Sequence, residues 1–141
     1  MADRPTLDPS KAPCAALTMA YQDHEFLRRW VDYYSRQFDR RHLYILSHGG
    51  DPEHRRIARG ANVIALPRDP TMFRMDRRRW SLISQFASGL LRYYNWVIAG
   101  DVDEVVVVDP DAAPDLQTYL WRYDVPDAPK SICPFGIELI H

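Results

Sequence analysis

Residues 95–108 read NWVIAGDVDEVVVV, an apolar run that ends in acidic residues and is followed at once by valines. The first part, residues 95–100, has the length and composition of a buried strand. Asp101, Asp103 and Glu104 then place three carboxylates within four residues. An apolar strand that ends in Asp-x-Asp gathers its charges at one point, the carboxyl end of the strand.

The rest of the chain alternates short apolar runs with segments of helical periodicity. Apolar runs predict strands at residues 14–21, 42–47, 62–66 and 95–100, with further short strands at 104–108 and 130–139. Helical spacing predicts helices at residues 23–38, 51–59, 76–94 and 115–123. Strands that alternate with helices predict an α/β sandwich, in which helices flank a mostly parallel central sheet.

Some details of these elements can also be predicted. Asp23 is the expected N-cap of the first helix. Trp80 and Tyr94 are expected on the buried face of the long third helix, together with its aliphatic residues. Residues 1–12 are polar and proline-bearing and are expected to form a disordered leader. Residues 13–141 are expected to form one unit.

Composition excludes several classes of protein. The chain has 141 residues, of which 46% are hydrophobic, so it fits one globular domain rather than a disordered chain. A net charge of −1 gives no indication of binding to nucleic acid or to an acidic membrane. No apolar run approaches the roughly 20 residues of a membrane helix, and the polar N-terminus is not a signal peptide. With Cys14 and Cys133 expected as buried free thiols, the interpretation is a cytoplasmic protein.

The acidic turn is the expected functional site. Ligands of open α/β sheets bind outside the carboxyl ends of the strands, where Asp101 and Asp103 are expected. Residues i and i+2 of an extended chain face the same side, so both carboxylates can converge while Val102 points away. A hard divalent cation, Mg²⁺ or Mn²⁺, relieves their repulsion. Glu104 alternates to the other face and is expected to be a charge at the rim.

Other residues have two interpretations each. His48, in a glycine-rich turn at a strand end, can contact a nucleotide or simply belong to the turn. The arginines 77–79 open the long helix, where they can bind a diphosphate, although a solvated charge run is the favoured interpretation. Trp121 and Tyr123 are candidates for an acceptor site.

Several segments together resemble a family 2-type glycosyltransferase of the GT-A fold. The matching segments are the strand at 14–21, the helix EFLRRWVDYYSRQF at 25–38, the strand HLYILS at 42–47 and WVIAGDVDEVVVV at 96–108. The subgroup combines a Glu-x-x-x-x-Trp helix, here Glu25 to Trp30, with Asp-x-Asp-Glu. The resemblance covers residues 14–140. It implies that a sugar passes from a nucleotide-diphosphate donor to the hydroxyl of an unspecified glycan, lipid or protein, assisted by Mn²⁺ or Mg²⁺.

The resemblance also implies roles for individual residues. Asp103 would coordinate the metal directly, and Asp101 would hold the donor ribose or the metal through water. Tyr21, Gln22 and Asp23 would lie under the nucleobase. All of these residues follow predicted strands, at the edge of the sheet where a nucleotide is expected.

Two features depart from the family pattern. The family has a nucleoside-binding Asp after its second strand, where this chain reads SHGGDPE, so Ser47, His48 or Asp51 would have to replace it. The catalytic base is an acid in the second half of such domains and has no counterpart before His141. We therefore expect a truncated N-terminal portion whose catalytic base lies beyond the chain.

Two other functions fit the same residues. In a phosphohydrolase of the haloacid-dehalogenase type, Asp101 would be the nucleophile and Asp103 the acid/base. That class carries the motif on its first strand and needs a downstream lysine, for which Lys130 alone is available after Asp103. A non-catalytic module that binds a nucleotide sugar is the third possibility, and it requires no catalytic base.

Overall fold

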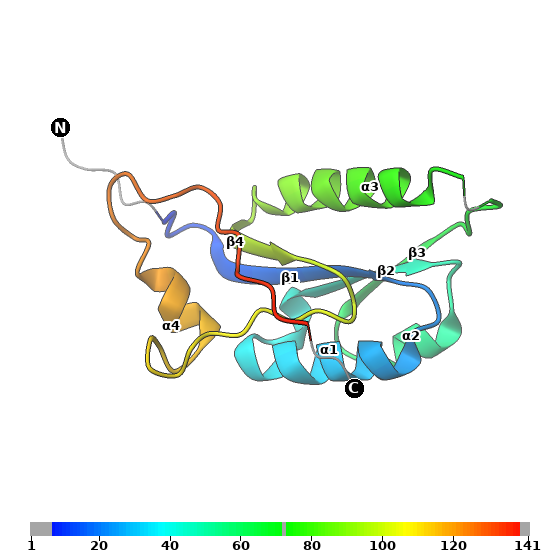
Figure 1. Cartoon of the computed structure of the whole chain (residues 1–141), viewed down its shortest axis with the longest axis horizontal. Coiled ribbons are helices and arrows are strands. Elements are labelled where there is room, and N and C mark those ends of the chain that lie inside the picture. The colour runs from blue at the N-terminus through cyan, green and yellow to red at the C-terminus, as the bar shows by residue number, and fades with distance from the viewer. Residues whose placement is uncertain (1–6, 72, 139–141) are drawn as a thin grey trace.

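A computed structural model of the chain describes residues 7–71 and 73–138, in which four parallel strands form one sheet (Figure 1). The strands are β1 (Ala12–Ala20), β2 (Leu43–His48), β3 (Asn62–Leu66) and β4 (Tyr94–Ala99), in the spatial order β3-β2-β1-β4. The helices are α1 (His24–Gln37), α2 (Pro52–Ile57), α3 (Met75–Leu90) and α4 (Leu116–Trp121), with a short 3-10 helix at Arg40–His42. The predicted α/β class with a parallel sheet flanked by helices is confirmed.

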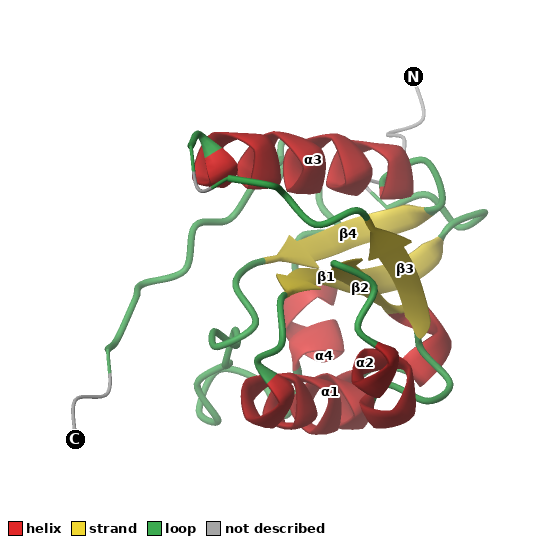
Figure 2. Ribbon diagram, turned by 90° about the vertical axis from the view of Figure 1, so that its right-hand side faces the viewer, coloured by secondary structure: helices red, strands yellow, loops and turns green. Residues whose placement is uncertain are grey.

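The helices form layers on both faces of the sheet (Figure 2). Helices α1 and α2 lie on one face and α3 lies on the other. Strand β1 is buried on both sides, and its side chains alternate between the two layers. Cys14, Ala16 and Ala20 pack with α1. Leu17 and Met19 belong to the separate cluster beneath α3.

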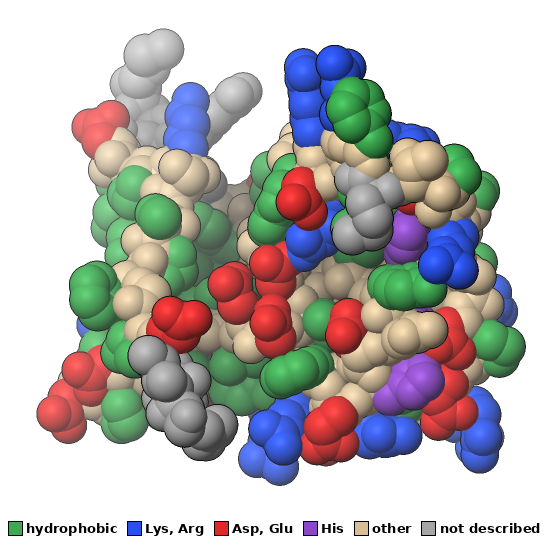
Figure 3. Space-filling view, turned by 45° about the vertical axis from the view of Figure 1, so that its right-hand side comes forward, with side chains coloured by type: hydrophobic (Ala, Val, Ile, Leu, Met, Phe, Trp, Pro, Cys, Tyr) green, Lys and Arg blue, Asp and Glu red, His purple; other side chains and the backbone are tan. Residues whose placement is uncertain are grey.

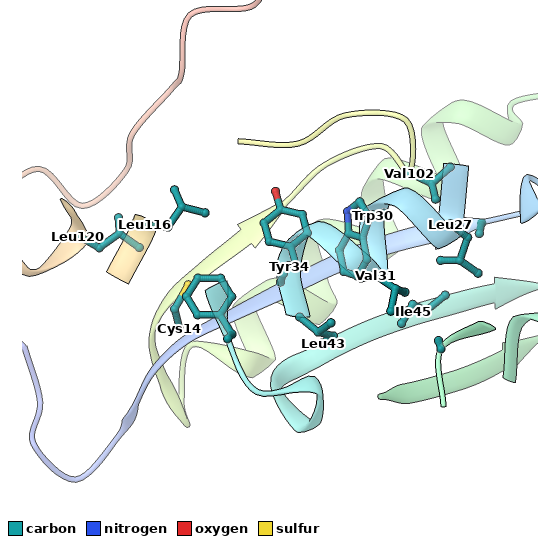
Figure 4. Close-up of a cluster of buried hydrophobic side chains, with 14 residues drawn as sticks. Cys14, Leu27, Trp30, Val31, Tyr34, Leu43, Ile45, Val102, Leu116 and Leu120 are labelled. Atoms are coloured by element: carbon teal, nitrogen blue, oxygen red, sulfur yellow. The ribbon is translucent and has the colours of Figure 1, made fainter. Parts of the chain in front are cut away.

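The larger core lies under α1 (Figure 4). Leu27, Trp30, Val31 and Tyr34 are buried at the i, i+3, i+4, i+7 spacing of one helix face. Leu116 and Leu120 of α4 join the same cluster. Helix α4 therefore extends the core along α1 at the end away from the carboxyl edge of the sheet.

The order of the strands places a switch point between β1 and β4. The chain passes from β1 outward through β2 to β3, and then returns to add β4 on the other side of β1. Strand β1 thus connects to β2 on one side, while β4 is added on its other side, and a crevice is expected at the carboxyl ends of β1 and β4. Leu17 pairs with Ala99, and the buried Thr18 hydroxyl donates to the Gly100 carbonyl at 3.0 Å. This bond fixes the chain where it leaves β4.

The strand predicted at residues 104–108 is not formed. The backbone of Val106 bonds to helix α1 instead of to a strand: its N–H donates to the Tyr34 hydroxyl at 3.0 Å, and its carbonyl accepts from the Tyr33 hydroxyl at 2.7 Å. Val106 and Val108 pack against the core, whereas Val107 is exposed. Residues 106–108 therefore alternate between packed and exposed side chains, as in an extended chain, but they pair with no strand of the sheet.

Two predicted elements at the ends of the fold also differ. Residues 130–138 form no strand, since Pro134 lacks an N–H for a ladder and Gly136 adds no side chain to pack; Leu139 lies outside the described residues. Helix α3 ends at Leu90, and Tyr94 opens β4 instead of closing the helix. Trp80 is exposed rather than buried, and the Arg79 guanidinium lies 5.0 Å from its ring centroid.

Smaller expectations need correction too. Asp23 occupies the N-cap position of α1, but its backbone is left-handed (φ 37°) and its side chain makes no capping bond. The leader expected at residues 1–12 is hydrogen-bonded from Leu7 onward, and Asp8 N–H donates to the Asn95 side chain at 2.7 Å; residues 1–6 lie outside the described residues. Cys14 is buried as expected, whereas Cys133 is exposed. None of the helices in the described part of the chain is long and apolar enough to cross a membrane.

Candidate functional site

A pocket of about 490 Å³ opens at the carboxyl edge of the sheet, and segments after all four strands contribute to its wall. Its lining includes Tyr21 and Asp23 after β1, His48 at the end of β2, Arg68 and Asp69 after β3, and Asp101 to Asp103 after β4. Met19, Phe26, Met75 and Arg79 add apolar surface and a further positive charge. Figure 3 shows acidic side chains gathered near the middle of this face, beside histidine and basic side chains.

The two acids after β4 reach the pocket from a tight turn. The Glu104 N–H donates to the Asp101 carbonyl at 3.1 Å, so residues 101–104 form a turn rather than the extended segment expected from the sequence. Val102 is 8% exposed and packs into the core under α1. Asp101 and Asp103 line the same pocket on either side of it. Burial of the middle residue thus holds both carboxylates at the edge of the sheet.

Helix α3 brings arginines to this edge. Arg79 forms an ion pair with Asp101, and Arg78 forms one with Asp69. The Arg79 and Asp101 side chains are 23% and 30% exposed, so their attraction is only partly screened by water. The interpretation of arginines 77–79 as a solvated run is therefore wrong for Arg79, whereas the Arg78 side chain is 68% exposed.

The rings of Tyr21 and His48 form an aromatic wall of the pocket at the carboxyl end of β2. The rings of Tyr21 and His48 meet edge to face with centroids 5.5 Å apart, and the Arg68 guanidinium lies 5.2 Å from the Tyr21 ring centroid. His48 Nε2 accepts a hydrogen bond from the Asp69 N–H at 3.0 Å, which holds the imidazole in place. Gly49 follows with φ +84°, a conformation that favours glycine and turns the chain beneath Tyr21.

Five of the six residues expected at the site line the pocket: Tyr21, Asp23, His48, Asp101 and Asp103. Gln22 is the one of the six that does not line the pocket. Its backbone carbonyl accepts a hydrogen bond from His54 Nε2 at 2.7 Å. Of the three residues considered as a nucleoside contact after β2, His48 lines the pocket, while Ser47 and Asp51 contact histidines.

The sequence analysis missed Arg68, Asp69 and the pairing of Arg79. Arg68 and Asp69 follow Pro67, which ends the third predicted strand. The rule that located the acids after β4 applies equally to the end of β3, and it would have found these two residues. The pairing of Arg79 with Asp101 depends on how α3 crosses the sheet, and no local pattern carries that information.

The donor atoms at the acidic turn fit a hard divalent cation. Asp103 makes no hydrogen bond or ion pair with any residue of the described ranges, so both of its carboxylate oxygens are available. The Asp101 carboxylate is paired with the Arg79 guanidinium. Carboxylate oxygens at an open edge suit Mg²⁺ or Mn²⁺, which complete their shells with water and phosphate oxygens.

The aromatic residues proposed for an acceptor site lie elsewhere. Trp121 lines a separate surface with Arg36 and Gln37, at the C-terminal end of α1. The pocket lies at the N-terminal end of the same helix, which is about 20 Å long. The Tyr123 ring packs on Trp96, with centroids 5.8 Å apart. Neither residue is therefore placed to line the pocket.

The chain was also compared with known proteins. No protein family, curated protein or solved structure matches it. Its function must therefore be argued from the pocket itself, namely from the residue types at the switch point and from the charges they carry.

Proposed function

We propose that the chain is the nucleotide-sugar-binding part of a glycosyltransferase, which binds its donor diphosphate together with Mn²⁺ or Mg²⁺ at Asp101 and Asp103. The observation that supports this function is the convergence of two carboxylates with Arg68 and Arg79 in one pocket at the switch point of the sheet. Acids and arginines together suit a diphosphate that carries a cation, because each charge of the ligand meets an opposite charge.

Each part of the pocket has a counterpart in such a ligand. The Tyr21 ring, held by His48 and Arg68, offers a flat surface on which a nucleobase can stack. Arg79 can exchange its contact with Asp101 for a phosphate oxygen when the metal binds the carboxylate. The bound metal would stabilise the charge that develops on the leaving diphosphate.

The other two functions lead to different measurements. A haloacid-dehalogenase-type phosphohydrolase needs Asp101 as a nucleophile, but Arg79 is paired with that carboxylate and lowers its nucleophilicity. Hydrolysis of an aryl phosphate that is lost in Asp101→Asn would favour this function. A non-catalytic module would bind nucleotide and metal without releasing free nucleoside diphosphate from a sugar donor.

The decisive experiment measures thermal unfolding with UDP or GDP in the presence and absence of Mn²⁺. Saturation at about 100 times the dissociation constant should stabilise the protein by about 2.7 kcal/mol. Asp103→Asn should abolish the metal-linked part of the shift. Asp111→Asn makes the same chemical change at an exposed position away from the pocket and should retain the shift. If neither nucleotide gives a metal-linked shift, the proposal is wrong.

A further inference from the structure

A second group of metal-ligating side chains lies beside the pocket, where α1 and α2 begin. His24 is the first residue of α1, Asp51 precedes α2, and His54 lies within α2. One ligand atom from each of the three residues can be chosen so that all three atoms lie within 4.8 Å of one another. His24 Nε2 is 2.6 Å from Asp51 Oδ2, and His54 Nε2 is 3.8 Å from the same oxygen.

The Asp51 carboxylate is oriented by the backbone. Its Oδ1 accepts a hydrogen bond from the Glu53 N–H at 2.9 Å and caps α2. Its Oδ2 is thereby directed at the two histidines. A carboxylate held in this way can give one oxygen to a cation without losing its role as the helix cap.

The buried histidine is oriented from behind. His54 is fully buried, and its Nδ1 lies 2.8 Å from the Ser47 hydroxyl, which is also buried. A hydroxyl can donate or accept, so it supports either tautomer of the imidazole. In the structure Nε2–H donates to the Gln22 carbonyl at 2.7 Å. With the proton on Nδ1 and donated to Ser47, Nε2 instead carries a lone pair, directed to the space beside the Gln22 carbonyl and 3.8 Å from Asp51 Oδ2.

We propose that His24, Asp51 and His54 form a binding site for a divalent transition metal of the zinc type, separate from the acidic turn at Asp101 and Asp103. Two imidazoles and one carboxylate match the ligands of zinc, which binds them at about 2.0–2.2 Å in tetrahedral geometry. Ligand atoms of such a site are about 3.3 Å apart. The observed separations of 2.6 and 3.8 Å bracket that value, and the half-exposed His24 side chain has room to adjust.

The two sites select different metals. Magnesium prefers oxygen ligands and keeps several waters, whereas imidazole nitrogen suits zinc and related ions. The Gln22 carbonyl, next to His54 Nε2, is a further oxygen that can complete the shell. The bound ion would join the β1–α1 loop to the β2–α2 loop. The first loop carries Tyr21 and the second begins directly after His48, so the metal would hold the aromatic wall in position.

The test is a titration of the EDTA-treated protein with Zn²⁺ in competition with a chromophoric chelator, without any nucleotide. The wild-type protein should bind about one equivalent of Zn²⁺, and Co²⁺ should give the visible absorption of a tetrahedral site. His24→Ala should weaken Zn²⁺ binding by about 100-fold or more, and Ser47→Ala, which removes the partner of Nδ1, by about 10–100-fold. Both variants retain His54, so the buried network is only partly changed.

Matched variants exclude other sources of binding. His42→Ala removes a histidine that bonds to Tyr94, and Cys133→Ser removes the exposed thiol; both should bind Zn²⁺ as the wild type does. Asp103→Asn should also leave Zn²⁺ affinity unchanged, which separates this site from the proposed nucleotide function. The proposal is overturned if the wild type binds no stoichiometric Zn²⁺, or if His24→Ala and Ser47→Ala bind Zn²⁺ as tightly as His42→Ala.

Discussion

Two groups of polar side chains share the carboxyl edge of the sheet and differ in how their acids are neutralised. At the acidic turn, Asp101 faces the guanidinium of Arg79, whose charge is permanent. Beside α2, Asp51 faces His24 at 2.6 Å and His54 at 3.8 Å, and imidazoles are neutral or charged depending on pH. The first group lines an open pocket, while the second contains a completely buried side chain.

The difference indicates that the two groups at this edge of the sheet have different roles. Arginine and carboxylate in an open pocket can exchange partners with an incoming ligand that carries both charges, because each then meets a new opposite charge. A buried histidine with both ring nitrogens bonded can exchange a partner only for another bound ligand, since a partner lost without replacement leaves an unsatisfied polar group. We therefore expect the acidic turn to respond to ligands and the histidine cluster to hold the loops. The following substitutions test that division.

The largest difference should appear between the two histidines of the cluster. His54→Ala leaves the Ser47 hydroxyl and the Gln22 carbonyl without their partner and should lower the free energy of unfolding by about 2–4 kcal/mol. His24→Ala removes a partly exposed ion pair and should cost less than about 1 kcal/mol. Urea unfolding in EDTA measures both values. Equal costs would contradict the structural role assigned to the buried histidine.

A smaller effect is expected from the residue between the two pocket acids. Val102→Ala removes two methyl groups from the core and should cost about 1–3 kcal/mol in urea unfolding. It should also weaken the nucleotide-dependent thermal shift, because the turn that carries Asp101 and Asp103 loses its contact with the core. Val107→Ala is the matched control at a position 68% exposed, and its cost should stay within about 0.5 kcal/mol.

Removing Arg79, the pocket arginine that pairs with Asp101, should change the affinity for the metal by a modest factor. Arg79→Gln frees Asp101 from its ion pair and should tighten Mn²⁺ binding without nucleotide by about 2–5-fold, the equivalent of a weak, partly screened ion pair. Affinity for the nucleoside diphosphate should fall in the same variant. Isothermal titration calorimetry measures both affinities, and Arg77→Gln, at an exposed position on α3, should change neither. Weaker Mn²⁺ binding in Arg79→Gln would show that Arg79 does not compete with the metal for the Asp101 carboxylate.

The smallest effect concerns acid stability. Hydrogen bonds from His24 and from the Glu53 N–H lower the pKa of Asp51 below its usual value. A lowered pKa means that the folded state holds the carboxylate charged more readily than the unfolded chain does. The resulting stabilisation is fully present above the ordinary Asp pKa of about 3.9 and is lost as pH falls through the lower folded value. Asp51→Asn should therefore flatten the acid limb of stability against pH, which urea unfolding at a series of pH values measures.

Local patterns predicted the parts of this structure that depend on neighbouring residues. The strand at 62–66 has the predicted bounds because a continuous apolar run, residues 63–66, ends at Pro67. The position of Asp101 and Asp103 at the carboxyl edge followed from the strand before them. By contrast, residues 104–108 have the valine content of a strand, yet the hydroxyls of Tyr33 and Tyr34 decide where their backbone bonds. Partners some 70 residues away leave no local signal.

The histidine cluster shows the same limit. His24 and Asp51 are 27 residues apart, and their contact depends on α1 and α2 starting side by side after adjacent strands. Sequence spacing alone treats Asp51 as a turn residue and His24 as the first residue of a helix. A topology in which β1 and β2 pair in parallel brings their following loops together, and only then does the metal-ligating set appear.

The bonds between Val106 and the two tyrosines have a consequence for the behaviour of the chain in a crowded solution. Four consecutive valines with high strand propensity form the kind of segment that nucleates cross-β aggregates. Because the N–H and carbonyl of Val106 are already bonded to side-chain hydroxyls, they are withheld from a strand of another molecule. We therefore expect Tyr33 and Tyr34 to oppose pairing of this segment with a strand of another molecule at Val106.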